Sequence, residues 1–133
     1  KIIAEINTDL FVIDCLPNMN EKLVFERMPV FLKTIKAKQP DTPILVVEDR
    51  TYANSFFSME RAKTNKSNRE ALLQVYSMLK TEGLNNVHYL HGNNLLGADG
   101  EDTVDGSHPT DLGFYRQAKV FFPTIHEILL RRE

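Results

Sequence analysis

The sequence predicts an α/β fold in which one parallel sheet lies between layers of helices. Three short stretches, Leu10–Ile13, Ile44–Val47 and Val87–Leu90, are predicted strands, and the first is an apolar run typical of a buried parallel strand. Each run is followed by a stretch with apolar residues at helical spacing. The connections between runs are also long enough for the helical crossovers that join parallel strands. We therefore expect a three-layer αβα sandwich with about three strands and their helices.

The first strand, Leu10–Ile13, runs into Asp-Cys-Leu-Pro-Asn. In open parallel sheets, ligands bind beyond the carboxyl ends of the strands. Asn18 or Asn20 can cap the next helix, whose apolar face is formed by Leu23, Val24, Met28, Phe31, Leu32 and Ile35. The second strand, Ile44–Val47, ends in Glu-Asp-Arg. These charged residues either shape a substrate pocket or form a local ion pair.

The stretch Thr51–Ser67 is polar and aromatic by turns, and we expect an elaborated loop there. Its aromatic residues Tyr52, Phe56 and Phe57 either line an acyl or sugar pocket or pack in the core. A helix is predicted over Asn68–Glu82, stopped by Gly83 and with an inner face of Leu72, Leu73, Val75, Tyr76 and Leu79.

The last predicted helix follows the third strand after a long connection rich in Gly, Asn and Asp. Pro109 or Thr110 suits its first positions. Apolar residues then recur at nearly helical spacing, namely Leu112, Tyr115, Ala118, Val120, Phe121 and Phe122. They predict the face that packs on the sheet.

The composition describes a single globular domain over residues 1–133. Its 42% hydrophobic and 26% charged residues are ordinary values for a globular protein and argue against disorder. A net charge of -2 without a basic stripe argues against nucleic-acid binding. No apolar run reaches membrane-spanning length, no signal peptide is visible, and the single Cys15 excludes an internal disulfide. The chain starts at Lys1 without a Met, in what has the pattern of a helix end (Ile2, Ile3, Ile6). We therefore expect a fragment or a processed chain.

The most informative stretch places Asp105 three residues before His108, in a loop that also contains Gly106 and Pro109. At this spacing the carboxylate can lie beside the imidazole, fix its tautomer and stabilise its protonated form, as a catalytic histidine requires. Asp, Ser, His and Pro are also ordinary turn residues. On spacing alone, a turn that only caps the last helix is therefore the favoured reading.

Two stretches resemble known blocks of the SGNH hydrolases, also called GDSL-type esterases and lipases. Asp-Gly-Ser-His-Pro-Thr-Asp-Leu-Gly-Phe, residues 105–114, is similar to the last block of that family, with its Asp-x-x-His pair. Asp9–Asn18 is similar to the third block, which closes a strand with an asparagine. The resemblance implies that His108 is the general base, that Asp105 orients it, and that Asn18 donates to the oxyanion. An Asx turn after Pro17 is the other reading of Asn18. No cofactor and no metal are implied.

The sequence departs from this family in two places. Leu16-Pro17-Asn18-Met19 stands where Gly-x-Asn-Asp is common, which puts the shape of that loop in doubt. The Gly-Asp-Ser block that carries the nucleophile does not occur in the chain, and Ser107 is too close to His108 to replace it. The resemblance therefore implies the C-terminal portion of an SGNH hydrolase domain, inactive alone. The missing strands, or a second copy of the chain, would pair with the open edge of Leu10–Ile13.

The resemblance implies a serine hydrolase of carboxylic esters. The likeness is closest to bacterial members assigned to acyl-ester or carbohydrate-ester removal, so the expected partner is a small-molecule or glycan ester. A periplasmic or extracellular parent protein fits this reading. The alternative is an inactive α/β module that binds or assembles through its open sheet edge. A flavodoxin-like ligand-binding domain is a third reading, but no strand ends in a Gly-rich phosphate loop.

Two further groups of residues contain side chains of the types that bind metals. Asp99, Glu101, Asp102 and Asp105 are acidic neighbours, but their spacing does not match a calcium-binding loop, and a solvated acidic loop is expected. His88, His91 and His126 lack metal-like spacing and are read as structural.

Overall fold

The computed structural model describes residues 2–131 and contains one sheet of three parallel strands in the order β1-β2-β3. The strands are β1 (Phe11–Ile13), β2 (Ile44–Val47) and β3 (Val87–Leu90). Phe11 pairs with Ile44, and Ile44 pairs with Val87. The predicted positions of the second and third strands are confirmed, and the first begins one residue later than expected. The expectation of a fragment or a processed chain was based on Lys1, and this residue lies outside the described residues.

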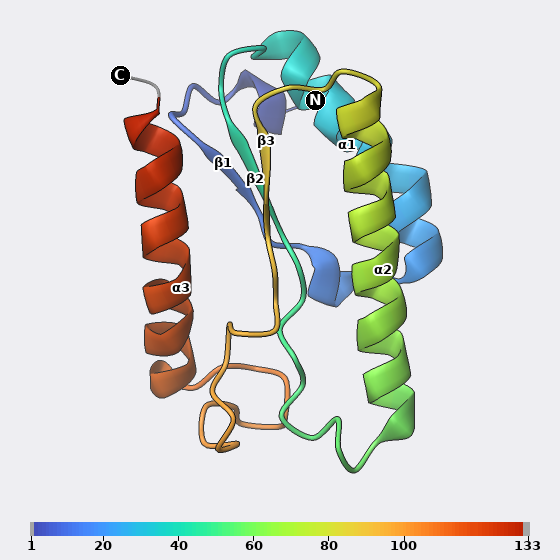
Figure 1. Ribbon diagram of the computed structural model, residues 1–133, viewed down its shortest axis with the longest axis vertical. Coiled ribbons are helices and arrows are strands. Elements are labelled where there is room, and N and C mark those ends of the chain that lie inside the picture. The colour runs from blue at the N-terminus through green and yellow to red at the C-terminus, as the bar shows by residue number, and fades with distance from the viewer. Residues whose placement is uncertain (1, 132–133) are drawn as a thin grey trace.

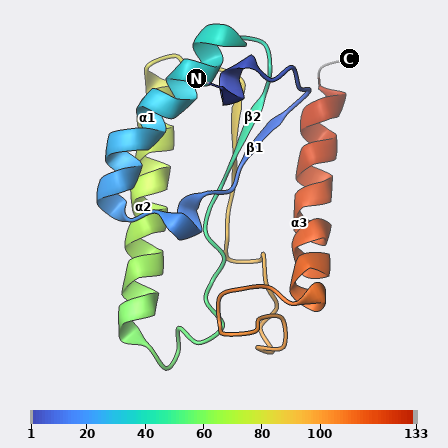
Figure 2. The same cartoon turned by 180° about the vertical axis from the view of Figure 1, so that it is seen from behind.

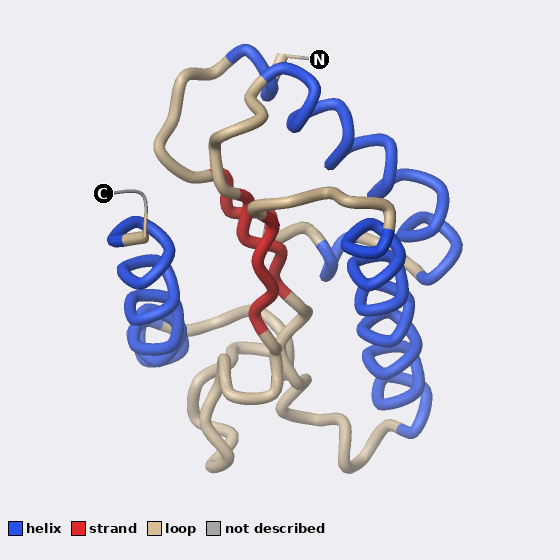
Figure 3. The backbone as a smooth tube through the Cα atoms, turned by 45° about the horizontal axis from the view of Figure 1, so that its top comes forward, coloured by secondary structure: helices blue, strands red, loops and turns tan. Residues whose placement is uncertain are grey.

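Helices cover both faces of this sheet, as the predicted sandwich requires. Helices α1 (Glu21–Lys38) and α2 (Met59–Thr81) lie side by side on one face, and α3 (Asp111–Leu130) lies on the other (Figures 1 and 2). Figure 3 shows the strands between these two layers. Among the described residues, no helix is long and apolar enough to cross a membrane.

The alternation of side chains along β2 divides the core into two parts. Ile44 and Val46 face α1 and α2, where they join a large cluster with Val24, Met28, Leu32, Ile35, Ala71, Leu72, Val75 and Leu79. Leu45 and Val47 face α3, where they join a smaller cluster with Leu95 and Ile128. Because both faces are covered, all four residues of β2 are buried, which explains why this strand reads as a continuous apolar run.

Helix α2 begins nine residues before the predicted start at Asn68. Ser58 caps it by accepting a hydrogen bond from the backbone N–H of Arg61. The expectation of a loop up to Ser67 was therefore wrong from Met59 onward. Its signal was hidden because Asn65, a buried position before the predicted start, is polar and interrupts the apolar spacing.

The packed face of α3 also differs from the predicted one. Val120 and Phe121 contact the core, together with Ile125 and Ile128. Leu112, Tyr115, Ala118 and Phe122 are exposed instead. The N-terminal segment differs too: Ile3–Glu5 forms one turn of 3-10 helix, η1, while Ile2, Ile3 and Ile6 are exposed.

The outer edge of β1 pairs with no other strand among the residues that the structure describes. Val12 on this strand is 41% exposed. A shallow, mainly apolar groove of about 510 Å³ runs along it, lined by Ile3, Val12, Ile13, Cys15, Met28 and Phe31 among others.

Candidate active site

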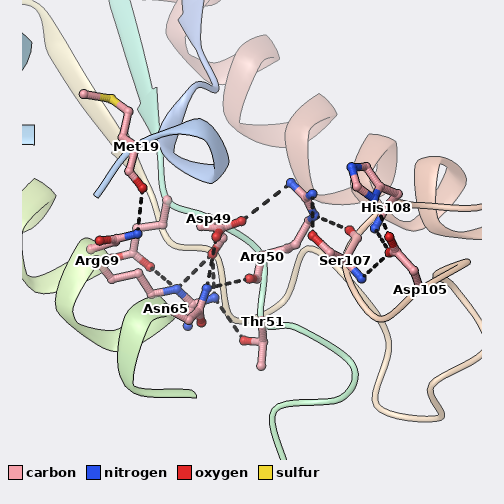
Figure 4. A network of polar contacts seen from close by, with 11 residues as sticks. Met19, Asp49, Arg50, Thr51, Asn65, Arg69, Asp105, Ser107 and His108 are labelled. Carbon is pink, nitrogen blue, oxygen red and sulfur yellow. Dashed lines mark hydrogen bonds and ion pairs between the residues drawn. The ribbon is translucent and has the colours of Figure 1, made fainter. Parts of the chain in front are cut away.

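Asp105 and His108 form a hydrogen-bonded pair in the turn before α3 (Figure 4). The Nδ1 atom of His108 lies 2.7 Å from Oδ2 of Asp105. The other carboxylate oxygen accepts hydrogen bonds from the backbone N–H groups of His108 and Ser107, at 2.8 and 3.0 Å. The hydrogen bonds from the backbone and ring of His108, followed by that from Ser107, hold the pKa of Asp105 well below its ordinary value.

An ionised Asp105 can only accept hydrogen bonds, so it places the ring proton of His108 on Nδ1 and leaves Nε2 as an acceptor. The His108 side chain is 75% exposed. Its Nε2 is therefore accessible to a group outside the turn and can take a proton from it, which is the chemistry of a general base.

The turn that carries this pair is fastened to the segment that follows β2. The carbonyls of three consecutive residues of the turn accept hydrogen bonds from residues 50–54. The Asp105 carbonyl accepts one from the Asn54 amide at 3.4 Å, and the Gly106 carbonyl accepts one from the Ala53 N–H at 2.8 Å. The Ser107 carbonyl accepts one from Nε of Arg50 at 2.6 Å. The turn is closed on its other side by a hydrogen bond from the Val104 N–H to the His108 carbonyl at 2.9 Å.

Thr110 caps α3 directly after the turn by accepting a hydrogen bond from the Gly113 N–H. Its own N–H donates to the Asp102 carbonyl at 2.9 Å. The expected helix start is thus confirmed to within one residue, with Thr110 as the cap and Asp111 as the first helical residue. The same turn thus carries the Asp105–His108 pair and starts the helix.

Asn18 lies in η2 (Leu16–Asn18), a short 3-10 helix that follows β1. Its backbone N–H binds the Cys15 carbonyl, and its side-chain amide makes no hydrogen bond with another described residue. The fold places Asn18 and His108 in loops at the same edge of the sheet, but the two residues do not bind each other. The Asn18 amide is thus available as a donor.

A buried polar network lies between these loops, at the carboxyl end of β2. Asp49 is fully buried. Its Oδ2 accepts a hydrogen bond from Asn65 at 3.2 Å, and its carbonyl accepts two from Arg69 at 2.8 and 2.6 Å. Arg50 lies 3.5 Å from Asp49 Oδ1 and reaches Ser107 on its other side (Figure 4). The local ion pair expected in Glu-Asp-Arg is present. The link from Arg50 to the turn could not be read from the sequence, because the two residues are 57 positions apart.

Asp14 is a second residue whose setting only the fold reveals. It directly follows β1, and burial raises its pKa, opposed by the charge of Arg50 and assisted by that of Asp49. The carboxyl ends of β1 and β2 thus bring their charged residues into one electrostatic environment. Its position directly after a buried strand was the available signal.

A cavity of about 830 Å³ borders the turn. It lies between residues 51–57 and 93–106, and Val104 and Gly106 of the turn belong to its wall. Phe56 and Phe57 also line it, are 77% and 83% exposed, and have ring centroids 3.9 Å apart. Core packing is therefore excluded for these two rings, whereas Tyr52 is half-buried.

The acidic residues of the same loop are bound by an arginine. Arg116 lies 2.7 Å from carboxylate oxygens of both Asp99 and Asp102. Asp102 is fully buried, so the expectation of a solvated acidic loop was wrong at this position. Among residues 2–131, no group of three or more His, Cys, Asp or Glu side chains is arranged to hold a metal ion.

The three other histidines lie apart from each other. His91 contacts Glu48 at 3.2 Å, His88 contacts Asn86 at 3.2 Å, and His126 stacks on Phe122.

Comparison with known proteins identifies the family of the chain. The model of the GDSL-like lipase/acylhydrolase family matches residues 1–126. The crystal structure of a protein from Bacteroides ovatus ATCC 8483 described as a GDSL-like lipase is 35% identical over 96% of this chain, with a TM-score of 0.92. The salicylyl-acyltransferase SsfX3 from a tetracycline biosynthetic pathway is 19% identical over 96% of the chain, with a TM-score of 0.74, and shares the fold. No curated protein matches the sequence.

The chain spans only part of these two proteins, 38% and 40% of their respective lengths. The family model nevertheless covers nearly all of the present sequence. This chain belongs to the GDSL-like lipase/acylhydrolase family.

Proposed function

We propose that the chain is the C-terminal portion of a serine hydrolase that cleaves carboxylic esters. The observation that carries the proposal is the Asp105–His108 pair, in which Nδ1 is bound by the carboxylate and Nε2 is left accessible. Family membership supports an ester hydrolase in general. The triad, the substrate and the origin of the nucleophile are our inferences.

In this proposal His108 Nε2 takes the proton of a serine hydroxyl while the serine oxygen bonds to the ester carbonyl carbon. Asp105 keeps the ring in the required tautomer and stabilises its protonated form. The Asn18 amide donates to the negative oxygen of the tetrahedral intermediate. Return of the proton from His108 to the alcohol oxygen breaks the ester C–O bond. Water then repeats the sequence and releases the acid.

The serine is supplied, in this proposal, by a segment of the parent protein outside these 133 residues. Two observations support it. The chain spans less than two fifths of the 35% identical structure, and β1 has an unpaired outer edge beside an apolar groove in the described part of the fold. A segment that adds a strand to β1 would cover both features.

A sugar ester is the substrate class that the cavity beside the turn supports best. Its wall combines amide side chains, Asn54, Asn93 and Asn94, with the exposed rings of Phe56 and Phe57. Amides exchange hydrogen bonds with hydroxyl groups, and aromatic faces pack on the apolar faces of sugar rings. The one ionised side chain in this wall, Asp99, is bound by Arg116, which disfavours a charged ligand.

The test is to assay the parent protein with its upstream segment, on an acetyl ester of p-nitrophenol and on an acetylated oligosaccharide. We expect His108→Ala to lower kcat/KM by at least about 10³-fold. His126→Ala, which alters an exposed histidine of α3, is the matched control and should keep its activity. Equal hydrolysis with and without the His108 change would show that the assignment is wrong.

The open edge of β1 favours a second candidate, an inactive module that assembles through this edge. Gel filtration coupled to light scattering tests it on the chain itself. A dimer that dissociates when Val12 is replaced by Lys would favour assembly, whereas a monomer at all concentrations would argue against it.

A further inference from the structure

The position of His108 depends on a segment distant in sequence. Residues 50, 53 and 54 donate to the carbonyls of residues 107, 106 and 105, in that order. Two of the three donors are an ordinary backbone N–H and an exposed amide. The third is the guanidinium of Arg50, whose hydrogen bond to the carbonyl adjoining His108 is the shortest, at 2.6 Å. Charge-assisted hydrogen bonds of this kind are stronger than neutral ones.

Arg50 is held in place from both sides. Nε donates to the Ser107 carbonyl, one terminal nitrogen donates to Ser107 Oγ at 3.1 Å, and the other lies 3.5 Å from Asp49 Oδ1. The side chain is only 12% exposed. Each of the three nitrogens of the guanidinium thus faces a protein oxygen.

Asp49 connects Arg50 to the body of the fold. Its carboxylate is fully buried, the guanidinium of Arg50 lies 3.5 Å from its Oδ1, and the side chain of Tyr52 also interacts with it. Asn65 and Arg69 of α2 bind the other oxygen and the carbonyl of Asp49. A continuous set of contacts therefore runs from α2, through the end of β2, to the turn that carries His108 (Figure 4).

We propose that Arg50 is a positioning residue for His108, an inference that rests on the proposed ester hydrolysis. Its hydrogen bonds and its ion pair are with Ser107 and Asp49 rather than with His108 or Asp105. It fixes the peptide that precedes His108, and so sets where the imidazole stands relative to the nucleophile. A displacement of about 1 Å in such a group costs on the order of 10²-fold in rate.

Arg50→Lys in the parent protein is the decisive variant. Lysine keeps the positive charge beside Asp49, so the fold is retained, but one ammonium cannot replace the planar fork that reaches Ser107 and Asp49 together. We expect kcat to fall by about 10- to 100-fold while KM changes by less than about 3-fold. Arg50→Gln alone would leave Asp49 buried and uncompensated. The double change Asp49→Asn with Arg50→Gln removes this problem and should lower kcat by a similar factor.

Lys36→Gln provides a matched control. Lys36 is also a buried cation that binds loop carbonyls, those of Pro40 and Thr42 at 3.0 and 2.6 Å, but it does so before β2 rather than after it. This variant should lower the melting temperature without lowering kcat. Ser107→Ala removes one of the two Ser107 acceptors and should cost no more than about 3-fold.

A spectroscopic measurement separates positioning from loss of stability. Long-range ¹H–¹⁵N spectra of the parent protein report which ring nitrogen of His108 carries the proton. We expect a single Nδ1–H form in the unmodified protein and a mixture of tautomers in Arg50→Lys. Amide exchange of Ser107 and His108 should be at least about 10-fold faster in this variant, with β2 and β3 unchanged.

The outcomes distinguish this inference from the proposed function. If His108→Ala abolishes hydrolysis but Arg50→Lys keeps full kcat and one tautomer, the positioning role is overturned and the function stands. A loss of kcat in Lys36→Gln as large as in Arg50→Lys would also overturn it, because general destabilisation would then explain both. If His108→Ala is active, the proposed function fails, while the tautomer and exchange measurements still decide whether Arg50 holds the turn.

Discussion

Replacement of Gly113 by Ala should destabilise the fold, although helix propensity alone predicts that Ala stabilises it. Gly113 is buried in the first turn of α3. A Cβ atom there would lie 2.2 Å from the Asp102 carbonyl oxygen and 2.9 Å from Cβ of Pro109. The carbonyl cannot simply move aside, because it accepts the hydrogen bond of the Thr110 N–H that starts the helix.

The magnitude follows from three contributions. Overpacking of this kind costs about 1–3 kcal/mol, and disruption of the Thr110 hydrogen bond costs about 1 kcal/mol. Ala is favoured over Gly in a helix by up to about 1 kcal/mol. The net loss is about 1–3 kcal/mol. With an unfolding entropy of about 2.1 cal/mol/K per residue, this loss lowers the melting temperature of 133 residues by about 4–10 °C.

The assay is thermal unfolding followed by circular dichroism, with Ala118→Gly as the control. Ala118 is an exposed position of the same helix, so its replacement measures the propensity term alone, about 1 kcal/mol. Gly113→Ala and Ala118→Gly are opposite exchanges, and both should lower the melting temperature. A melting temperature of Gly113→Ala equal to or above that of the unmodified chain would refute the steric argument.

Three further predictions concern stability. Leu32 is 1% exposed in the core cluster, so Leu32→Ala should lower the free energy of unfolding in urea by about 2–5 kcal/mol. Phe57 is 83% exposed, so Phe57→Ala should lower it by less than about 0.5 kcal/mol. Equal losses in the two variants would contradict the assigned burial. Burial, with the charge of Lys80, lowers the pKa of His88 from 6.5. The unfolded chain therefore binds a proton at His88 more readily than the folded one, and the stability of the fold should decrease as the pH drops below about 6.5. His88→Gln should make the stability less dependent on pH between pH 7.5 and 5.5. The hydrogen bond from Arg116 holds the pKa of Asp99 far below 3.8. The ionised Asp99 therefore contributes to the stability of the fold above about pH 4, and this contribution is lost as the pH falls below that value. In urea titrations, Arg116→Gln should weaken this dependence of stability on acid.

Local patterns were sufficient where the physical cause was local. β2 could be read from the sequence because a strand covered on both faces is a continuous apolar run, and β3 also lies at its predicted position. The contact between Asp105 and His108 could be anticipated because three residues separate them in a tight turn. Long-range contacts had no such signal. The start of α2 was missed because Asn65 is buried to bind the carbonyl of Arg50, a contact that no periodicity reveals.

The error in α3 has a related cause. Apolar residues occur around most of this helix, and the pattern does not indicate which of them face the sheet. Val120 and Phe121 pack on the core, while Tyr115 and Phe122 are 58% and 69% exposed. Only the position of the helix relative to the sheet decides between them.

The three contacts between residues 50–54 and residues 105–107 also limit how the gene can change in length. The donors and acceptors run in opposite directions, 50 to 107, 53 to 106 and 54 to 105. One inserted codon between positions 50 and 53 would therefore put every later donor out of register with its carbonyl. An insertion beside Gly100, where the turn has open space around it, would disturb none of them. We expect related sequences to differ in length at the second place and to keep a constant spacing at the first.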